Sequence, residues 1–280
     1  MIRLHLPQPL SAGAALAPTL DQSRYLTQVM RLKLGDALVV FNGQDGEWRC
    51  DLTDILKKGV VLTAQEQVRP QAMGPDVQLL MAVVKKSAME FAVEKATELG
   101  VRHIRPILTA RTQGHHLRLD RLDAIAIESA EQTGRMDLPA IDDPVRLADV
   151  LDGWDPGRRL MFCDETGGGA PVLTALSHSP SPSWGGTASH EASQGGAAPD
   201  IPTPIAAAIA PPHEGEGERP AGPWAILIGP EGGFSPQERD RLRALPYATA
   251  VSLGPRVLRA DTAAIAALTL WQTAVGDWER

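Results

Sequence analysis

The chain is poor in the residues that mark several protein classes. Its 280 residues include two cysteines, Cys50 and Cys163, which form neither a metal-ligand spacing nor a disulfide framework. Such scarcity is typical of a reducing compartment, so we expect a cytoplasmic protein. No apolar run is long enough to span a bilayer. Pro7, Pro9 and Gly13 interrupt the first residues, so we also expect no signal peptide.

Positive charge is scarce as well. The 27 Lys and Arg residues are outnumbered by 34 Asp and Glu residues, which gives a net charge of −7 at pH 7. Spread evenly, this charge would argue against binding to a phosphate backbone. It is concentrated instead, because the tract from Glu165 to Gly222 has six acidic residues and one basic residue, Arg219. The rest of the chain is close to neutral, so local basic patches decide whether it binds nucleic acid.

Composition divides the chain into two domains and an insertion. Residues 1–73 contain strand candidates at 37–41, 47–55 and 60–68, separated by Gly-containing turns, which predicts a small β-barrel. In residues 74–280 apolar runs alternate with helical stretches, which predicts an α/β domain with a mostly parallel sheet. The tract 165–222 is rich in Gly, Pro, Ala and Ser. It has too little apolar surface to offset its ordering entropy, so we expect a disordered insertion.

Within the α/β domain, apolar runs and capping signals locate the elements. The runs predict buried parallel strands at 77–84, 101–108, 160–163, 225–228 and 250–253. Long helices are expected at 117–135 and about 262–275. Helix ends are indicated by Ser87 with Glu90, by Gly100, by Ser235 with Pro236 and Glu238, and by Asp261 or Thr262.

The most specific local motif is GPEGG, from Gly229 to Gly233, directly after an apolar strand candidate and before the capped helix at Ser235. Glycines at the carboxyl end of a strand let the backbone approach a ligand closely, and α/β proteins bind ligands at that edge. The alternative is a plain turn.

Three further segments have an ordinary structural explanation when each is taken alone. They are LGPRVLRADTA from Leu253 to Ala263, EQTGR from Glu131 to Arg135 ahead of Pro139, and KATELG from Lys95 to Gly100. The ordinary explanations are solvated arginines, a polar helix end, and an amphipathic helix that ends at a glycine.

Together and in this order, the four segments resemble the RsmE-type 16S rRNA uridine-N3 methyltransferases. The resemblance covers the chain except its insertion. It implies a SPOUT methyltransferase domain with a C-terminal trefoil knot built on 160–164, 225–228 and 250–253, plus a PUA-like RNA-binding barrel. It also implies S-adenosyl-L-methionine as cofactor, 16S rRNA in the 30S subunit as substrate, and a homodimer through the knotted domain. Two residues depart from the family pattern: Asp261 replaces a glutamate, and the family's histidine is missing near Tyr25.

The resemblance places the cofactor in two loops, held largely by backbone groups. The residues are Leu227, Ile228, Gly229, Pro230, Glu231, Gly232 and Gly233 in the first loop, and Leu253, Gly254, Arg256, Val257 and Leu258 in the second. No metal cluster is visible, and displacement at a sulfonium needs none.

The chemistry requires that a uridine N3–H lose its proton. This group ionises about two pH units above neutral, so forming the anion at pH 7 costs about 3 kcal/mol. Glu231 is the candidate base, and the alternative is that its carboxylate only braces the loop. Arg259 is the candidate for stabilising charge or holding a phosphate. Arg135 could reach the site from a helix end, in this subunit or its partner.

Contacts to RNA are expected from the barrel. Basic candidates for the RNA backbone are Arg3, Arg24, Arg31 and Lys33, and Tyr25 is a candidate for stacking on a base, unless it packs against the barrel. Two other functions stay open: a SPOUT ribose 2′-O-methyltransferase, and a non-catalytic RNA-binding ribosome-assembly factor. A Rossmann oxidoreductase is disfavoured because no early strand is followed by G-x-G-x-x-G.

Overall fold

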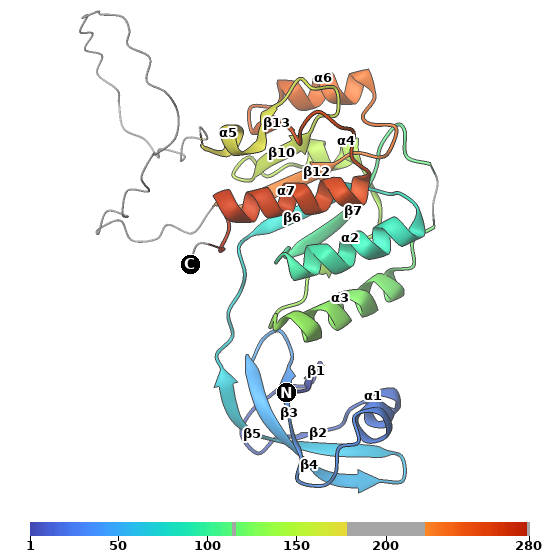
Figure 1. The fold of residues 1–280 in the computed structure, drawn as a ribbon, viewed down its shortest axis with the longest axis vertical. Helices are drawn as coiled ribbons and strands as arrows, with labels where there is room; N and C mark the ends of the chain where they lie inside the picture. The colour runs from blue at the N-terminus through green and yellow to red at the C-terminus, as the bar shows by residue number, and fades with distance from the viewer. Residues whose placement is uncertain (114–115, 178–221, 279–280) are drawn as a thin grey trace, which may run out of the picture.

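The computed structural model describes residues 1–113, 116–177 and 222–278, and Figure 1 shows them as two units, each built on its own β-sheet. A five-stranded sheet comes from the first 69 residues, and an eight-stranded sheet with helices on both faces follows from residue 77 onward. The two units meet where β1 (Arg3–His5) lies beside the end of α3 (Leu119–Thr133).

The smaller unit is a twisted, mostly antiparallel sheet. Its strand order is β1, β3 (Ala37–Phe41), β4 (Glu47–Leu56), β5 (Gly59–Arg69) and β2 (Ala15–Leu16). Residues that face the core alternate along parts of β3 and β5, as period-two patterning requires. Leu38 and Val40, for example, are fully buried in its core. The helix α1 (Leu20–Arg24) and the π-helical turn Tyr25–Val29 close one side. The predicted strands at 37–41, 47–55 and 60–68 are confirmed.

The larger sheet is parallel throughout. Its order is β11 (Ala170–Pro171), β13 (Ala248–Ser252), β10 (Arg159–Cys163), β12 (Trp224–Ile228), β6 (Val77–Ala82), β7 (His103–Leu108) and β8 (Ala140–Ile141). The short β9 (Val145–Arg146) also pairs with β7. Every residue of β12 is buried, because helices cover both faces of the sheet. The apolar runs therefore correspond to strands that are buried on both faces of the sheet. The prediction of an α/β domain with a mostly parallel sheet is confirmed.

The alternation of side chains distributes the core between the two faces. Leu79 and Met81 of β6 pack with α2 (Lys86–Glu98), α3 and α7 (Ala260–Ala274) on one face. Leu80, between them, packs on the opposite face near α4 (Leu147–Asp152) and α6 (Pro236–Ala244). Both layers lie against the sheet in Figure 1. This packing fixes the strand ends and hence the loops that follow them.

One helix start was predicted correctly and two were not. Ser235 caps α6 in a capping box with Glu238, as expected. The signal at Ser87 was wrong, because α2 begins at Lys86 and its N-cap, Lys85, makes no side-chain cap. The signal at Asp261 or Thr262 was also wrong. Helix α7 begins at Ala260, so Asp261 and Thr262 lie within its first turn. The Asp261 carboxylate accepts a hydrogen bond from the Thr262 N–H.

The predicted insertion starts too early in the sequence. Residues 165–177 include β11 and the helix α5 (Val172–Ser177), in which Val172 and Leu176 are buried against the core that includes α7. These two apolar side chains supply the burial that the tract as a whole was expected to lack. The remainder of the predicted insertion, 178–221, lies outside the described residues.

The three strands expected to build the knot are direct neighbours. β10 lies between β13 and β12 and is parallel to both. The chain therefore passes from β10 to one side, and then from β12 through α6 to the other side of β10. The threading itself stays a prediction, because residues 178–221 of the connection are not among those described.

Candidate active site

The GPEGG loop follows β12 at the carboxyl edge of the sheet, and two of its glycines are required by geometry. A Cβ on Gly229 would lie 3.2 Å from two ring carbons of buried Phe234. Gly233 has a φ of +65°, and a Cβ there would collide with the Glu165 carboxylate. Its N–H donates to the Pro230 carbonyl at 2.8 Å and closes the turn. The turn thus depends on a backbone conformation at Gly233 that favours glycine.

The loop after β7 is fastened by one hydrogen bond to the start of α6 and by another to the GPEGG loop. The Ala110 N–H donates to Glu238 Oε1 at 2.7 Å, while Oε2 of the same carboxylate accepts from the Ser235 N–H at 2.9 Å. Arg111 Nη1 donates to the Gly232 carbonyl at 2.6 Å. One capping glutamate therefore fixes both the start of α6 and the neighbouring loop.

A cavity of about 550 Å³ lies between these loops. It is lined by Val83, Lys85, Arg111, Gln113, Glu231 and Gly232, which come from the ends of β6, β7 and β12. Of the predicted catalytic residues, it includes Glu231. Lys85, Arg111 and Gln113 were missed by sequence reasoning, although each follows a strand that was predicted. The rule that ligands bind at the carboxyl edge could have found them.

The second predicted cofactor loop follows β13. Gly254 adopts a φ of +108°, and its N–H donates to Ser252 Oγ at 3.3 Å. Val257 is 78% exposed, which leaves a large apolar side chain uncovered beside exposed Arg256. Arg259 is the N-cap residue of α7 and its side chain is also exposed. The strand β10 separates this loop from the GPEGG loop in the sheet.

An ion pair with a buried carboxylate supports the end of β10 between the two loops. The Asp164 side chain is fully buried and accepts hydrogen bonds from Arg243 and from the Thr166 hydroxyl. Burial by itself raises the pKa of Asp164, but the bonds from Thr166 and Arg243 outweigh it and hold the pKa below its ordinary value. The carboxylate therefore stays charged and keeps the turn after β10 in place.

Arg135 does not join Glu231 within one chain. Its guanidinium is almost buried, pairs with Asp137 at 2.8 and 3.0 Å, and donates to the Thr97 carbonyl at 3.0 Å. Thr97 lies at the end of α2, just before β7 begins, so Arg135 sits at the amino edge of the sheet. In this chain Arg135 ties α2 to the segment after α3. A role at the partner's site stays a prediction.

Arg3 also has a different place from the one predicted. Its guanidinium donates to Glu47 at 2.5 Å and to three backbone carbonyls, those of Ala130, Glu131 and Arg135, at 2.6, 2.9 and 3.0 Å. The carbonyls of Ala130 and Glu131 lie in the last turn of α3, where helix carbonyls lack intrahelical partners, and that of Arg135 follows the helix. Arg3 therefore fastens the barrel to α3, and four of its five N–H donors are engaged within the protein.

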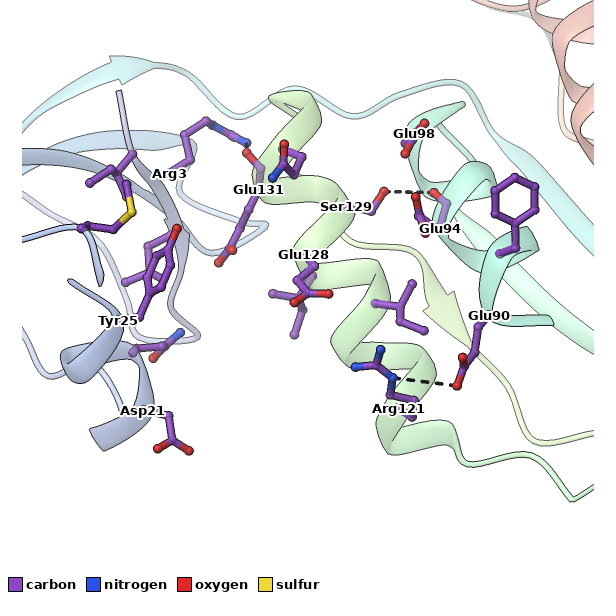
Figure 2. Close-up of a pocket in the computed structure, with 18 of the residues that line it drawn as sticks. Arg3, Asp21, Tyr25, Glu90, Glu94, Glu98, Arg121, Glu128, Ser129 and Glu131 are labelled. Atoms are coloured by element: carbon purple, nitrogen blue, oxygen red, sulfur yellow. Dashed lines mark hydrogen bonds and ion pairs between the residues drawn. The ribbon is translucent and has the colours of Figure 1, made fainter. Parts of the chain in front are cut away.

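Tyr25 lines a large acidic cleft, shown in Figure 2, between the barrel and the helices α2 and α3. The cleft measures about 1320 Å³, and its carboxylates are Asp21, Glu90, Glu94, Glu98, Glu128 and Glu131. Burial first, and the nearby Glu128 as well, raise the pKa of Glu131 above its ordinary value. Such a surface repels phosphates, so stacking of Tyr25 on an RNA base is disfavoured.

The remaining barrel candidates are solvent-accessible. Arg24 is exposed and forms an ion pair with Asp21 at 3.5 Å. Arg31, with a φ of 59°, and Lys33 are exposed at the turn after the π-helical segment. Among residues 1–113, 116–177 and 222–278, no group of three or more His, Cys, Asp and Glu could hold a metal ion. Within the same ranges no helix is long and apolar enough to cross a membrane.

Comparison with known proteins identifies the two units. The family model of the RNA methyltransferase domain matches residues 72–182 and 205–272, and the model of the RNA methyltransferase PUA domain matches 18–65. The chain is 28% identical to ribosomal RNA small subunit methyltransferase E of Rickettsia conorii, over 95% of this chain and 93% of the relative. It is 24% identical to the protein of that name from Bacillus subtilis, over 94% and 91%.

Solved structures agree in fold. The Legionella pneumophila protein Lpg2936, in complex with the cofactor SAM, superimposes with a TM-score of 0.72 at 26% identity and covers 99% of this chain and 98% of its own. Ribosomal RNA small subunit methyltransferase E of Neisseria gonorrhoeae superimposes with a TM-score of 0.74 at 23% identity, over 99% of both chains. The family model covers well over half of the chain, so the protein belongs to the RNA methyltransferase family, in agreement with its resemblance to the RsmE type.

Proposed function

We propose that the protein transfers a methyl group from S-adenosyl-L-methionine to N3 of a uridine in 16S rRNA of the small ribosomal subunit. The observation that carries the proposal is the position of Glu231. It lies in the glycine loop on which the resemblance to the RsmE type rests, and it lines a cavity together with two cationic side chains. The names of the relatives, all ribosomal RNA small subunit methyltransferase E, support the RNA and the subunit.

The two loops fit the cofactor that the family implies. Gly254, with no atom near the position of a Cβ, leaves the backbone open to close approach, and exposed Val257 offers an apolar surface for a ring to cover. The residues Leu227 to Gly233 and Leu253 to Leu258 would hold it, largely through backbone groups. When bound, S-adenosylmethionine supplies the methyl group from its sulfonium. SAM bound to the Legionella protein, which has the same fold, supports this assignment.

The protein's own groups then move the proton and balance the charge. The Glu231 carboxylate takes the proton from uridine N3, at a step that costs about 3 kcal/mol at pH 7 without assistance. Arg259, at the start of α7, faces solvent and is available to a phosphate of the RNA. A carboxylate beside cations suits an acceptor that must lose a proton, as N3 of a uridine does.

The barrel serves RNA recognition in this proposal. Arg24, Arg31 and Lys33 remain available to the phosphate backbone, because their side chains are exposed. A homodimer through the knotted domain, in the cytoplasm, completes the proposal. The resemblance to the RsmE type is what supports the dimer.

The test is methyl transfer from labelled S-adenosylmethionine to 30S subunits taken from a strain without this modification. We expect label in 16S rRNA, and a 10²- to 10⁴-fold slower reaction for Glu231→Gln. The matched control is Glu165→Gln, which changes a carboxylate beside Gly233 that does not line the cavity. Cofactor binding by calorimetry without any transfer to 30S subunits would contradict the proposed substrate. An active Glu231→Gln variant would contradict the proposed base.

A further inference from the structure

We propose that the cavity between the ends of β6, β7 and β12 receives the target uracil. In this site Lys85 is a catalytic residue that contacts uracil O2 or O4, and Arg111 is a positioning residue that holds the Glu231 loop. The inference rests on the proposed function and extends it to residues that no sequence motif indicated. It assigns the stabilisation of negative charge on the uracil to Lys85, which lines the same cavity as the general base Glu231.

The cavity has the size and the lining that a single base requires. Its volume of about 550 Å³ lies within the range of small-molecule sites, and the Gln113 amide offers both a donor and an acceptor to a pyrimidine edge. Val83 provides an apolar wall. A nucleotide turned out of its RNA helix presents this edge to a protein, and enzymes that modify bases use such extruded nucleotides.

Lys85 brings positive charge from two sources. Its side chain is exposed at the cavity, and no ion pair engages it among the residues that the structure describes. It is also the N-cap residue of the 13-residue helix α2, which has no side-chain cap. The first N–H groups of α2 and the helix dipole therefore add to the lysine charge. The adjacent Lys86 differs, because it pairs with Glu90 at 3.8 Å on the acidic cleft.

Arg111 acts on the loop. Its Nη1 donates to the Gly232 carbonyl at 2.6 Å, and its Cβ and Cδ lie 3.7 and 3.6 Å from where a Cβ of Gly232 would be. The guanidinium thus bonds the residue next to Glu231, while its aliphatic stem covers Gly232. The Ala110 N–H donates to Glu238, and this bond fixes the backbone directly before Arg111. It sets the direction of the Glu231 carboxylate.

The reaction step balances with these groups. The N3–H proton passes to the Glu231 carboxylate, and the N3 electron pair forms the bond to the methyl carbon. The carbon–sulfur bond breaks and leaves its electron pair on sulfur, which becomes a neutral thioether. Negative charge that develops on uracil O2 and O4 faces the Lys85 ammonium until the new bond forms. Glu231 then releases its proton to water.

The test compares Lys85→Met with Lys86→Met as the matched control. Single-turnover methylation of 30S subunits is measured between pH 6 and the highest pH that the subunits tolerate. If Lys85 stabilises the uracil anion, Lys85→Met reacts roughly 100-fold slower at pH 7. The deficit then shrinks as rising pH ionises the uridine. Lys86→Met reacts like the wild type. A deficit that is constant with pH, or none, overturns the role of Lys85.

Arg111 is tested by substitution and rescue. Arg111→Met is expected to lower the rate at saturating 30S subunits without raising KM, and Arg111→Lys to recover part of it by donating to the Gly232 carbonyl. Arg118→Met, which removes a charge paired with Asp120, is the control and should leave the rate unchanged. A rise in KM with an unaltered maximal rate would overturn the positioning role of Arg111.

A measurement without cofactor separates this inference from the proposed function. The N3 group of 5-fluorouridine 5′-monophosphate is more acidic than that of uridine, and its ionisation shifts the fluorine resonance. Bound to the protein, its N3 pKa is expected to be lower with the wild type than with Lys85→Met. Equal values would overturn the contact even if the wild type methylates 16S rRNA. A wild type that makes no 3-methyluridine would instead contradict the proposed function.

Discussion

Replacing Arg3 by Met should loosen the joint between the barrel and the methyltransferase domain. Arg3 links Glu47 of β4 to the last carbonyls of α3, and its side chain is 14% exposed. It also lies over the Phe41 ring, 4.6 Å from the centroid. Met keeps most of the apolar stem and removes the donors, so the variant isolates the polar part of the joint.

The magnitude follows from the groups left without partners. The Glu47 side chain is 7% exposed and would keep one of its two arginine partners, Arg69. Three carbonyls that follow or end α3 would lose a charged donor at 2.6 to 3.0 Å. Removing one partner of a buried pair typically costs 3–5 kcal/mol, and we expect the free energy of unfolding to fall by about 3 kcal/mol.

Urea unfolding and hydrogen exchange measure the effect. The midpoint should fall for Arg3→Met, and amides of β1 and of the last turn of α3 should exchange faster. The control is Arg49→Met, which removes a half-buried arginine of β4 that pairs with Asp51 and Glu66 at 2.8 and 2.9 Å. That change should have a much smaller effect. Equal effects of the two substitutions would refute the assignment of Arg3 to the joint.

Three other outcomes follow. Burial alone raises the pKa of Glu47, but hydrogen bonds from Arg69 and Arg3 lower it below its ordinary 4.5. The ionised Glu47 carboxylate therefore contributes its full free energy of stabilisation above pH 4.5, and this contribution is lost as the pH falls below the lowered pKa. Acid unfolding of Glu47→Gln should accordingly depend less on pH, and an unchanged profile would argue against the pair. Ser235→Ala removes the cap of α6 and should lower the free energy of unfolding by about 1 kcal/mol in urea titrations. Gly233→Ala forces a side chain into the left-handed region beside Glu165. Calorimetry should show weaker S-adenosylmethionine binding, and unaltered affinity would contradict the role of the turn.

Much of the α/β unit was predictable from local patterns. The run from Val77 to Val84 and the run ending at Ile228 are apolar on both faces, and such runs occur where helices cover a parallel sheet on both sides. Ser235 was predictable because its capping partner lies three residues away. These features depend on neighbours in sequence, which a single chain reveals.

Features that depend on distant residues were not predictable. Arg3 meets carbonyls 127 and 128 positions away, and nothing in its own segment distinguishes it from an RNA-binding arginine. Arg135 belongs to a motif that suggested chemistry, but its guanidinium is held by Asp137 and Thr97. The helix α5 forms because Val172 and Leu176 reach an apolar core that other segments supply.

The sequence predicted only part of the candidate site. The GPEGG motif located Glu231, since glycines at a strand end have a clear physical purpose. Lys85 and Arg111 belong to no motif, and they join Glu231 only because β6, β7 and β12 lie side by side in the sheet. Strand order, which periodicity does not encode, was the missing information.

The central claim is tested most directly by nucleoside analysis of 16S rRNA from cells that lack this protein. Mass spectrometry of the digested RNA should show 3-methyluridine missing in those cells, restored by the wild-type chain and not by Glu231→Gln. Unchanged 3-methyluridine with loss of a 2′-O-methylated nucleoside would contradict the account, because the fold would then serve a different acceptor.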